Sequence, residues 1–204
     1  NGIWDMSLLG VVPGLRLAAP RDAASLREQL REAVSVSDAP TVVRFPKGTV
    51  PDDIVAVRRI DGVDILRESD TCDVLIVAVG AFASLGLEVA DALAAQGIST
   101  TVVDPRWALP IPTRLAGLAA DADLVVVLED NMRAGGVGTA MRSALEDAGV
   151  GTPALTFGMP PEFPEHGALA SVLAHAGLSA QDIARRVTER VAAPIPDLSG
   201  DVAP

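Results

Sequence analysis

The run DVLIVAV, residues 73–79, constrains the fold of this chain more than any other segment. After its first residue it is entirely apolar, with three valines and one isoleucine. Such a run is typical of a strand that is buried on both faces, and strands of this kind occur mainly in parallel sheets covered by helices. The segment therefore predicts a central strand of an α/β sheet.

The segments after this strand alternate between strand-like and helical patterns. Phe82, Leu85, Val89 and Leu93 recur at helical spacing, and Gly97 is placed to end that helix. Further strands are predicted at residues 98–103, 124–128 and 154–157, and further helices around residues 115–118, 135–147, 168–175 and 179–191. This order predicts an open, mostly parallel α/β sheet with helices on both faces.

A smaller strand, helix, strand unit precedes that sheet. Its strands are predicted at residues 15–18 and 41–45, and the helix between them begins near Asp22. Residues 49–71 show no sustained period and are interpreted as a linker with a short hairpin around Asp61 and Gly62. The predicted organisation is residues 1–48 for the end of one domain, 49–72 for the linker, 73–192 for a second domain and 193–204 for a flexible tail.

The charge and the cysteine content narrow the possible partners and compartment. A net charge of −11 disfavours a nucleic-acid partner, because nothing in the sequence forms a basic stripe. The single cysteine, Cys72, fits a reducing compartment, so cytoplasm is expected. The longest nearly apolar run, residues 74–87, is too short for a transmembrane helix, and the first residue, Asn1, is expected not to be a natural start.

Several longer motifs point to one family. These are NGIWDMSLLGVVPGLRLAAPRD at the start, TVVRFPKG, DPRWALPIP, EDNMRAGGVGTA, and PEFPEHG with GLSAQDIARRV near the end. In order and spacing the chain resembles the carboxy-terminal portion of the 1-deoxy-D-xylulose-5-phosphate synthases, thiamine-diphosphate enzymes of the transketolase superfamily. The resemblance implies a domain of transketolase C-terminal type, preceded by the end of an α/β pyrimidine-binding domain.

The resemblance also implies an activity for the intact protein. That activity is the condensation of pyruvate with D-glyceraldehyde 3-phosphate, with loss of CO2, in a homodimer that uses thiamine diphosphate and Mg2+. The product feeds isoprenoid precursors, thiamine and pyridoxal phosphate. The cofactor- and metal-binding residues and the catalytic residues are expected upstream of this chain, so the fragment alone is expected to be inactive.

Lys47 is the main candidate for a substrate-binding residue in this chain. It is the only lysine, and it follows the predicted strand 41–45 and Pro46, where open α/β sheets place their ligands. The resemblance places Lys47 where family members usually carry an arginine that contacts the acceptor phosphate. From the bare sequence, a solvated charge at a strand end is the more common role. A lysine also lacks the two-point fork of arginine, so the change could loosen the orientation of the acceptor.

Other residues have weaker claims to a role. Arg44, on the same strand, is a second candidate for substrate binding, although pairing with a carboxylate is favoured. Asp5 is expected to support the active-site loop, to start a helix or to form a salt bridge. His166 and His175 lack metal-ligand spacing, and His166 is expected to make a capping or packing hydrogen bond.

The glycine-rich segment 134–138 resembles a phosphate loop at a helix start, but it lacks the full spacing, and the preceding Glu129 and Asp130 would repel an anion. A structural use is therefore preferred. Cys72 precedes a buried strand and is expected to be inert. No catalytic, cofactor-binding or metal-binding residue is predicted within this chain.

Three alternative functions remain open at this point. Within the superfamily, the chain could be the carboxy-terminal region of a transketolase or of a 2-oxoacid dehydrogenase β subunit, although the PEFPEHG and GLSAQDIARRV ending favours the synthase. The fragment could instead be a non-catalytic assembly module. A free-standing nucleotide-binding domain ranks last, because the first strand-to-helix turn of the second domain has only one glycine before its helix.

Overall fold

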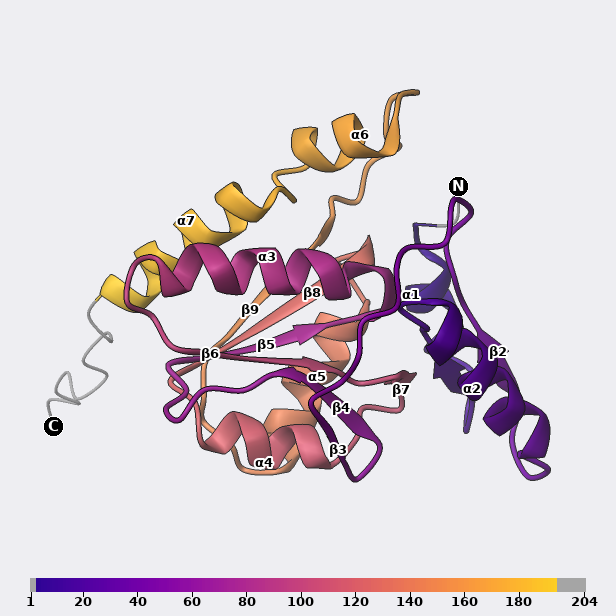
Figure 1. Cartoon of the computed structure of the whole chain (residues 1–204). Coiled ribbons are helices and arrows are strands. Elements are labelled where there is room, and N and C mark those ends of the chain that lie inside the picture. Colours follow the sequence, from indigo (N-terminus) through magenta and orange to yellow (C-terminus); the bar gives the residue numbers. More distant parts are fainter. Residues whose placement is uncertain (1–2, 194–204) are drawn as a thin grey trace, which may run out of the picture.

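The computed structural model describes residues 3–193, whose strands form two sheets (Figure 1). The larger sheet has six strands in the order β3-β4-β6-β5-β8-β9. Their bounds are β3 (Arg58–Ile60), β4 (Val63–Arg67), β5 (Val74–Ala78), β6 (Thr100–Asp104), β8 (Leu124–Met132) and β9 (Ala154–Met159). β5 pairs in parallel with both β6 and β8, and β8 pairs in parallel with β9. The predicted parallel α/β sheet is confirmed, with DVLIVAV at its centre.

Helices cover both faces of this sheet. On one face lie α3 (Ala83–Ala94), which follows the short 3-10 helix η1 (Gly80–Phe82), and α7 (Ala180–Ala192), which packs on α3. On the other face lie α4 (Arg114–Ala120) and α5 (Val137–Asp147). α6 (Leu169–His175) lies farther out beside α7, as Figure 1 shows. Two buried apolar clusters, one on each face, hold these layers together.

The segment interpreted as a linker contributes two strands to the large sheet. β3 and β4 form the predicted hairpin, and Asp61 and Gly62 both have positive φ angles, 48° and 85°, as a tight hairpin turn requires. β4 then pairs antiparallel with β6, and Val63 and Ile65 are fully buried. The predicted hairpin, residues 58–67, therefore lies within the large sheet as two of its strands.

The smaller unit contains α1 (Asp5–Leu9), α2 (Ala23–Ser35) and a three-stranded sheet in the order β2-β1-β7. β1 (Arg16–Ala18) and β2 (Thr41–Val43) pair in parallel, as the strand, helix, strand pattern suggested. The third strand, β7 (Trp107–Leu109), belongs to the segment DPRWALPIP, for which the sequence predicted no strand. β7 pairs antiparallel with β1, so the small sheet is completed by a strand that follows β6.

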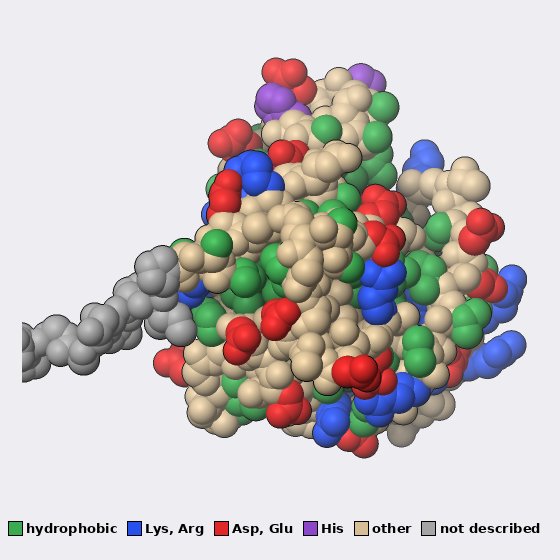
Figure 2. All heavy atoms as spheres, turned by 60° about the vertical axis from the view of Figure 1, so that its left-hand side comes forward, with side chains coloured by type: hydrophobic (Ala, Val, Ile, Leu, Met, Phe, Trp, Pro, Cys, Tyr) green, Lys and Arg blue, Asp and Glu red, His purple; other side chains and the backbone are tan. Residues whose placement is uncertain are grey.

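The predicted tail, residues 193–204, lies almost entirely outside the described residues. None of the helices within residues 3–193 has the length and apolar character needed to cross a bilayer. The face in Figure 2 carries acidic and basic side chains interspersed over its surface.

Candidate functional site

The end of β2 and the far end of β8 meet at the side chain of Arg44. The Nε atom of Arg44 lies 3.3 Å from a carboxylate oxygen of Asp5, the first residue of α1. Its Nη1 atom forms an ion pair with the Asp130 carboxylate on β8, and Nη2 donates to the Asp130 carbonyl oxygen at 3.4 Å. One guanidinium from the small unit is thus held by a strand of the large sheet and by α1.

The charge balance around Arg44 decides what this side chain can bind. Burial acts to lower the pKa of Arg44, but the charges and hydrogen bonds of Asp130 and Asp5 outweigh it and raise the pKa. The Arg44 side chain is only 12% exposed, and its guanidinium pairs with two carboxylates. Its carboxylate pairing is the role that the sequence favoured, and binding of substrate by Arg44 stays a prediction.

Lys47 follows three residues after Arg44 and is more exposed. It is exposed, in the stretch of residues 44–57 that contains no helix or strand. Arg44 and Arg21, the neighbouring cations, form ion pairs with carboxylates. Lys47 forms none within residues 3–193. An exposed ammonium group at the carboxyl end of a parallel strand is available to a small anion. Contact of Lys47 with the acceptor phosphate stays a prediction.

A second polar cluster lies directly beside Asp130. The carboxylate of Glu129 is fully buried and accepts hydrogen bonds of 2.9 Å from the backbone N–H groups of Val137 and Gly138 at the start of α5. Burial raises the pKa of Glu129 to about 7, although these two backbone hydrogen bonds act in the opposite direction. The N-terminus of α5 is thus occupied by a carboxylate of the protein itself, which fits the structural use predicted for the glycine-rich segment.

The next residue but one, Asn131, ties α1 to β8. Its amide oxygen accepts the N–H of Met6 at 3.2 Å, and its amide nitrogen donates to the Ser7 hydroxyl at 2.9 Å. The same nitrogen also donates to the Met132 carbonyl oxygen at 2.9 Å. Since Asn131 is fully buried, α1, and with it Asp5, has a fixed position on the large sheet.

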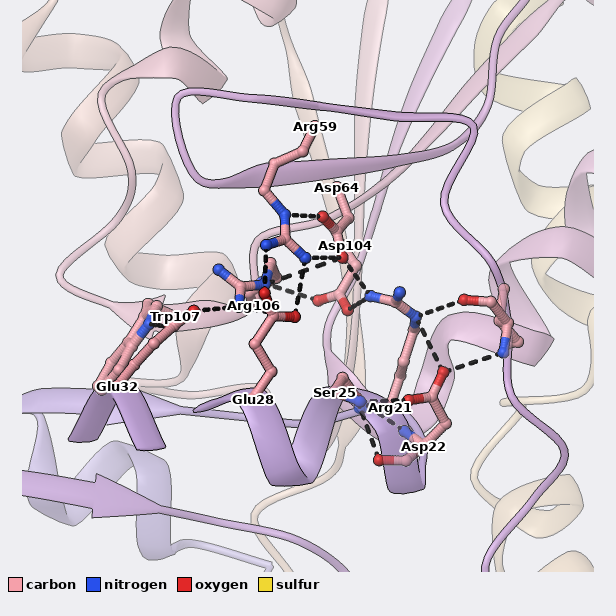
Figure 3. Close-up of polar contacts among 11 residues, drawn as sticks. Arg21, Asp22, Ser25, Glu28, Glu32, Arg59, Asp64, Asp104, Arg106 and Trp107 are labelled. Carbon is pink, nitrogen blue, oxygen red and sulfur yellow. Dashed lines mark hydrogen bonds and ion pairs between the residues drawn. The ribbon is translucent and has the colours of Figure 1, made fainter. Parts of the chain in front are cut away.

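Figure 3 shows the second joint between the two units, which the sequence did not reveal. Arg21, just before α2, donates hydrogen bonds of 2.7 Å to carboxylate oxygens of Asp64 on β4 and Asp104 on β6. Its Nε atom donates to the carbonyl oxygen of Ile54 at 3.1 Å. Asp22, which caps α2, accepts the N–H of Ile54 at 2.9 Å. The chain that leads away from Lys47 is therefore fixed again at Ile54.

Two further arginines extend this joint along α2. Arg59 pairs with both Asp64 and Glu28, and Arg106 pairs with Glu28 and Glu32 (Figure 3). The indole N–H of Trp107 on β7 donates to Glu32 at 2.8 Å. α2 is thus attached through its acidic side chains to β3 and to the segment around β7.

The other candidates from the sequence lie away from these contacts. His166 and His175 are exposed and line a hollow of about 670 Å³ between the 159–167 segment and α6. No hydrogen bond joins the His166 side chain to residues 3–193, so neither the capping nor the packing hydrogen bond expected for it is found there. Cys72 is half-buried, and burial raises the pKa of its thiol, which disfavours the reactive thiolate.

A metal centre has no donor set in the part of the chain that the structure describes. Within residues 3–193, no group of three or more His, Cys, Asp or Glu side chains is placed to hold an ion. The acidic residues of the Arg21 joint are instead directed at guanidinium groups.

Two family models match the chain in the order of its two units. Residues 1–52 match the transketolase pyrimidine binding domain, and residues 62–183 match the transketolase C-terminal domain. The second match begins inside the β3-β4 hairpin and covers every strand of the large sheet except β3. The chain belongs to the transketolase C-terminal domain family.

Two close relatives of this chain are 1-deoxy-D-xylulose-5-phosphate synthases. The chain is 60% identical over 194 residues to 1-deoxy-D-xylulose-5-phosphate synthase 2 of Streptomyces coelicolor, covering 94% of this chain and 30% of the relative. It is 57% identical over 192 residues to 1-deoxy-D-xylulose-5-phosphate synthase of Leifsonia xyli, again covering 94% of this chain and 30% of the relative. The resemblance inferred from the motifs is confirmed, and the chain spans about 30% of the length of these relatives.

Solved structures show the same fold. A split-gene transketolase, described as an inactive beta4 tetramer, superposes with a TM-score of 0.80 at 28% identity, covering 92% of this chain and 61% of that one. Transketolase from Campylobacter jejuni superposes with a TM-score of 0.66 at 18% identity, covering 90% of this chain and 27% of that one. At that lower identity the likeness shows the fold alone.

Proposed function

We propose that the protein to which this chain corresponds is a thiamine-diphosphate-dependent transferase that makes 1-deoxy-D-xylulose 5-phosphate and CO2 from pyruvate and D-glyceraldehyde 3-phosphate. The observation that supports this proposal is the 60% identity to a named synthase over 94% of the chain. The identity to the split-gene transketolase is lower, 28%, which favours the synthase over the transketolase alternative.

In this proposal Lys47 binds the phosphate of the acceptor. A phosphate monoester carries close to two negative charges near neutral pH, and an exposed ammonium group is a suitable point charge for it. Lys47 is exposed and lies beyond the carboxyl end of β2, on the side where ligands of parallel α/β sheets bind. Arg44, which is already paired with two carboxylates, supports this segment and is the weaker candidate for direct contact.

The cofactor is assigned to the rest of the protein. Thiamine diphosphate, with Mg2+ on its diphosphate group, would supply the chemistry that activates pyruvate. In this proposal the residues that bind the cofactor and its metal lie outside this chain, as the resemblance implies. We accordingly expect the 204-residue chain alone to lack synthase activity.

For the complete protein we propose a cytoplasmic homodimer.

The second candidate function, a non-catalytic assembly module, applies to this chain by itself. It is supported by the split-gene transketolase, an inactive beta4 tetramer, of which this chain covers 61%. Under that reading the isolated chain should self-associate without binding thiamine diphosphate, which sedimentation and calorimetry can measure.

The test uses the complete enzyme with variants at Lys47. Lys47→Ala should raise the KM for D-glyceraldehyde 3-phosphate by at least about tenfold and change the KM for pyruvate by less than about twofold, because only the acceptor carries a phosphate. Lys47→Arg should keep or lower the KM for the acceptor, since it retains the charge and adds a two-point contact. Equal changes in both KM values would exclude the proposed role of Lys47.

A further inference from the structure

The geometry points to Asp130 as a positioning residue for the acceptor phosphate. Asp130 lies on β8 of the large sheet, while Lys47 follows β2 of the small unit. By holding Arg44, Asp130 fixes the end of β2 and therefore the place from which Lys47 reaches the phosphate. This inference rests on the proposed function and assigns part of acceptor binding to the transketolase C-terminal domain.

The first support is how little else holds the segment around Lys47. Residues 45–53 are exposed. On one side, the N–H of Arg44 donates to the carbonyl oxygen of Ala18 at 2.8 Å, and its side chain reaches Asp130. On the other side, the next contacts within the described chain are those of Asp53 with the N–H of Ala24 and of Ile54 with Arg21 and Asp22. Arg44 is therefore the last anchor before Lys47.

The second support is the quality of the anchor. The side chains of Arg44 and Asp130 are 12% and 15% exposed, so water screens their ion pair weakly. Asp130 receives Arg44 through both its carboxylate and its carbonyl oxygen. Asp5 also pairs with Arg44, but it is 35% exposed and makes a single contact at 3.3 Å. Asp130 is thus the main partner and belongs to a nine-residue strand of the sheet.

A positioning role of Asp130 and a simple charge effect predict opposite changes in the KM for the acceptor. Replacing Asp130 with Asn removes a negative charge near a site for anions. Long-range attraction alone would then lower the KM for pyruvate and for the phosphorylated acceptor, because both are anions. If Asp130 acts by positioning, loss of the ion pair releases the Lys47 segment, and the KM for the acceptor rises although the local charge has become more favourable.

The experiment compares variants of the complete enzyme by steady-state kinetics. Asp130→Asn should raise the KM for D-glyceraldehyde 3-phosphate by about tenfold and leave the KM for pyruvate within about twofold, since the ordering of one substrate contact is lost. Asp130→Glu, which keeps the charge, should restore at least part of the acceptor affinity. The matched control is Asp91→Asn, which breaks an exposed ion pair with Arg67 in the same domain and should change neither KM.

A second variant covers the case in which Asp130→Asn does not fold. Arg44→Lys keeps a positive charge beside Asp130 but loses the contacts of the planar fork, and it should shift the acceptor KM in the same direction. If the acceptor KM is unchanged or lower in the folded variants while Lys47→Ala raises it, the positioning role is wrong and the proposed function stands. If the wild-type enzyme does not use D-glyceraldehyde 3-phosphate, the proposed function and this inference fail together.

Discussion

Arg21 donates a hydrogen bond of 2.7 Å to Asp104, a residue 83 positions later in the chain. Arg21 precedes α2 in the small unit, and Asp104 ends β6 in the large sheet. Their side chains are 7% and 0% exposed, so the pair lies in the interior. Burial raises the pKa of Asp104 to about 6, even though Arg21 acts to lower it. The contact between the two units therefore depends on buried charges. These charges can reach water only if the two units separate.

The first prediction concerns the removal of Arg21. Arg21→Met should lower the free energy of unfolding by about 3–5 kcal/mol, because it leaves the carboxylate of Asp104 buried without an ion-pair partner. Asp64 loses one of its cations but keeps its ion pair with Arg59. Arg16→Met is the matched control, since Arg16 pairs with Asp38 on the surface, where the two side chains are 44% and 73% exposed. That control should cost about 0–1 kcal/mol.

Urea unfolding of the 204-residue chain at neutral pH measures both variants. The midpoint should fall clearly for Arg21→Met and little for Arg16→Met. Equal losses would mean that the buried contact contributes no more than a surface pair, and the two units would then be joined mainly by apolar packing.

The central part of the fold could be predicted from the sequence because its signals are local. DVLIVAV contains its own strand pattern, and Val89 and Leu93 mark the buried stripe of α3 without reference to any other segment. β7 could not be found in this way. Trp107–Leu109 is three residues long, and what makes it a strand is pairing with β1, about 90 residues earlier.

The residues of the candidate site could likewise be predicted from the sequence only where the signal is local. Lys47 was found because it combines a strand end with the only lysine, which is information within one short segment. The partners of Arg44 and Arg21 come from strands that are distant in sequence, so their pairing depends on the tertiary fold. One local signal was available: Glu28 and Glu32 are four residues apart on α2, a like-charge pair that is unfavourable unless cations such as Arg106 lie between them.

The second prediction concerns the glycine at the start of α5. A Cβ atom on Gly136 would lie 2.6 Å from the carbonyl oxygen of Met132 and would also collide with the Glu129 carboxylate. Gly136→Ala should therefore cost about 1–3 kcal/mol of unfolding free energy, because backbone or a buried side chain has to move. Gly151→Ala is the control, since a Cβ there meets nothing within 4 Å.

Thermal unfolding of this chain can compare the two alanine variants. Gly136→Ala should lower the melting temperature by several degrees, and Gly151→Ala should leave it nearly unchanged. If Gly136→Ala were as stable as the control, the close contact between the glycine-rich segment and Glu129 would not exist in solution.

The third prediction concerns the pH dependence of stability. Burial raises the pKa of Glu129 from its ordinary value of 4.5 to about 7 in the folded chain. Between these two values the folded state holds a proton that the unfolded state has released, so the free energy of unfolding falls as pH rises through this window. A pKa shift of this size lowers the free energy of unfolding by about 3 kcal/mol once the pH has risen above 7.

Glu129→Gln removes this titration and isolates it by difference. The variant loses one acceptor for the N–H groups of Val137 and Gly138, so it should be less stable than the wild type near pH 4.5. The difference in stability should then shrink, or change sign, as pH rises to about 7.5, since only the wild type has to ionise a buried carboxyl group. Asp104, whose pKa is raised to about 6, is present in both proteins, so its contribution largely cancels in the difference.

Urea unfolding from pH 4.5 to 7.5 gives the two curves of stability against pH. The control is Glu146→Gln, an exposed change on α5. Parallel curves for the wild type and Glu129→Gln would show that Glu129 does not change its protonation in this range.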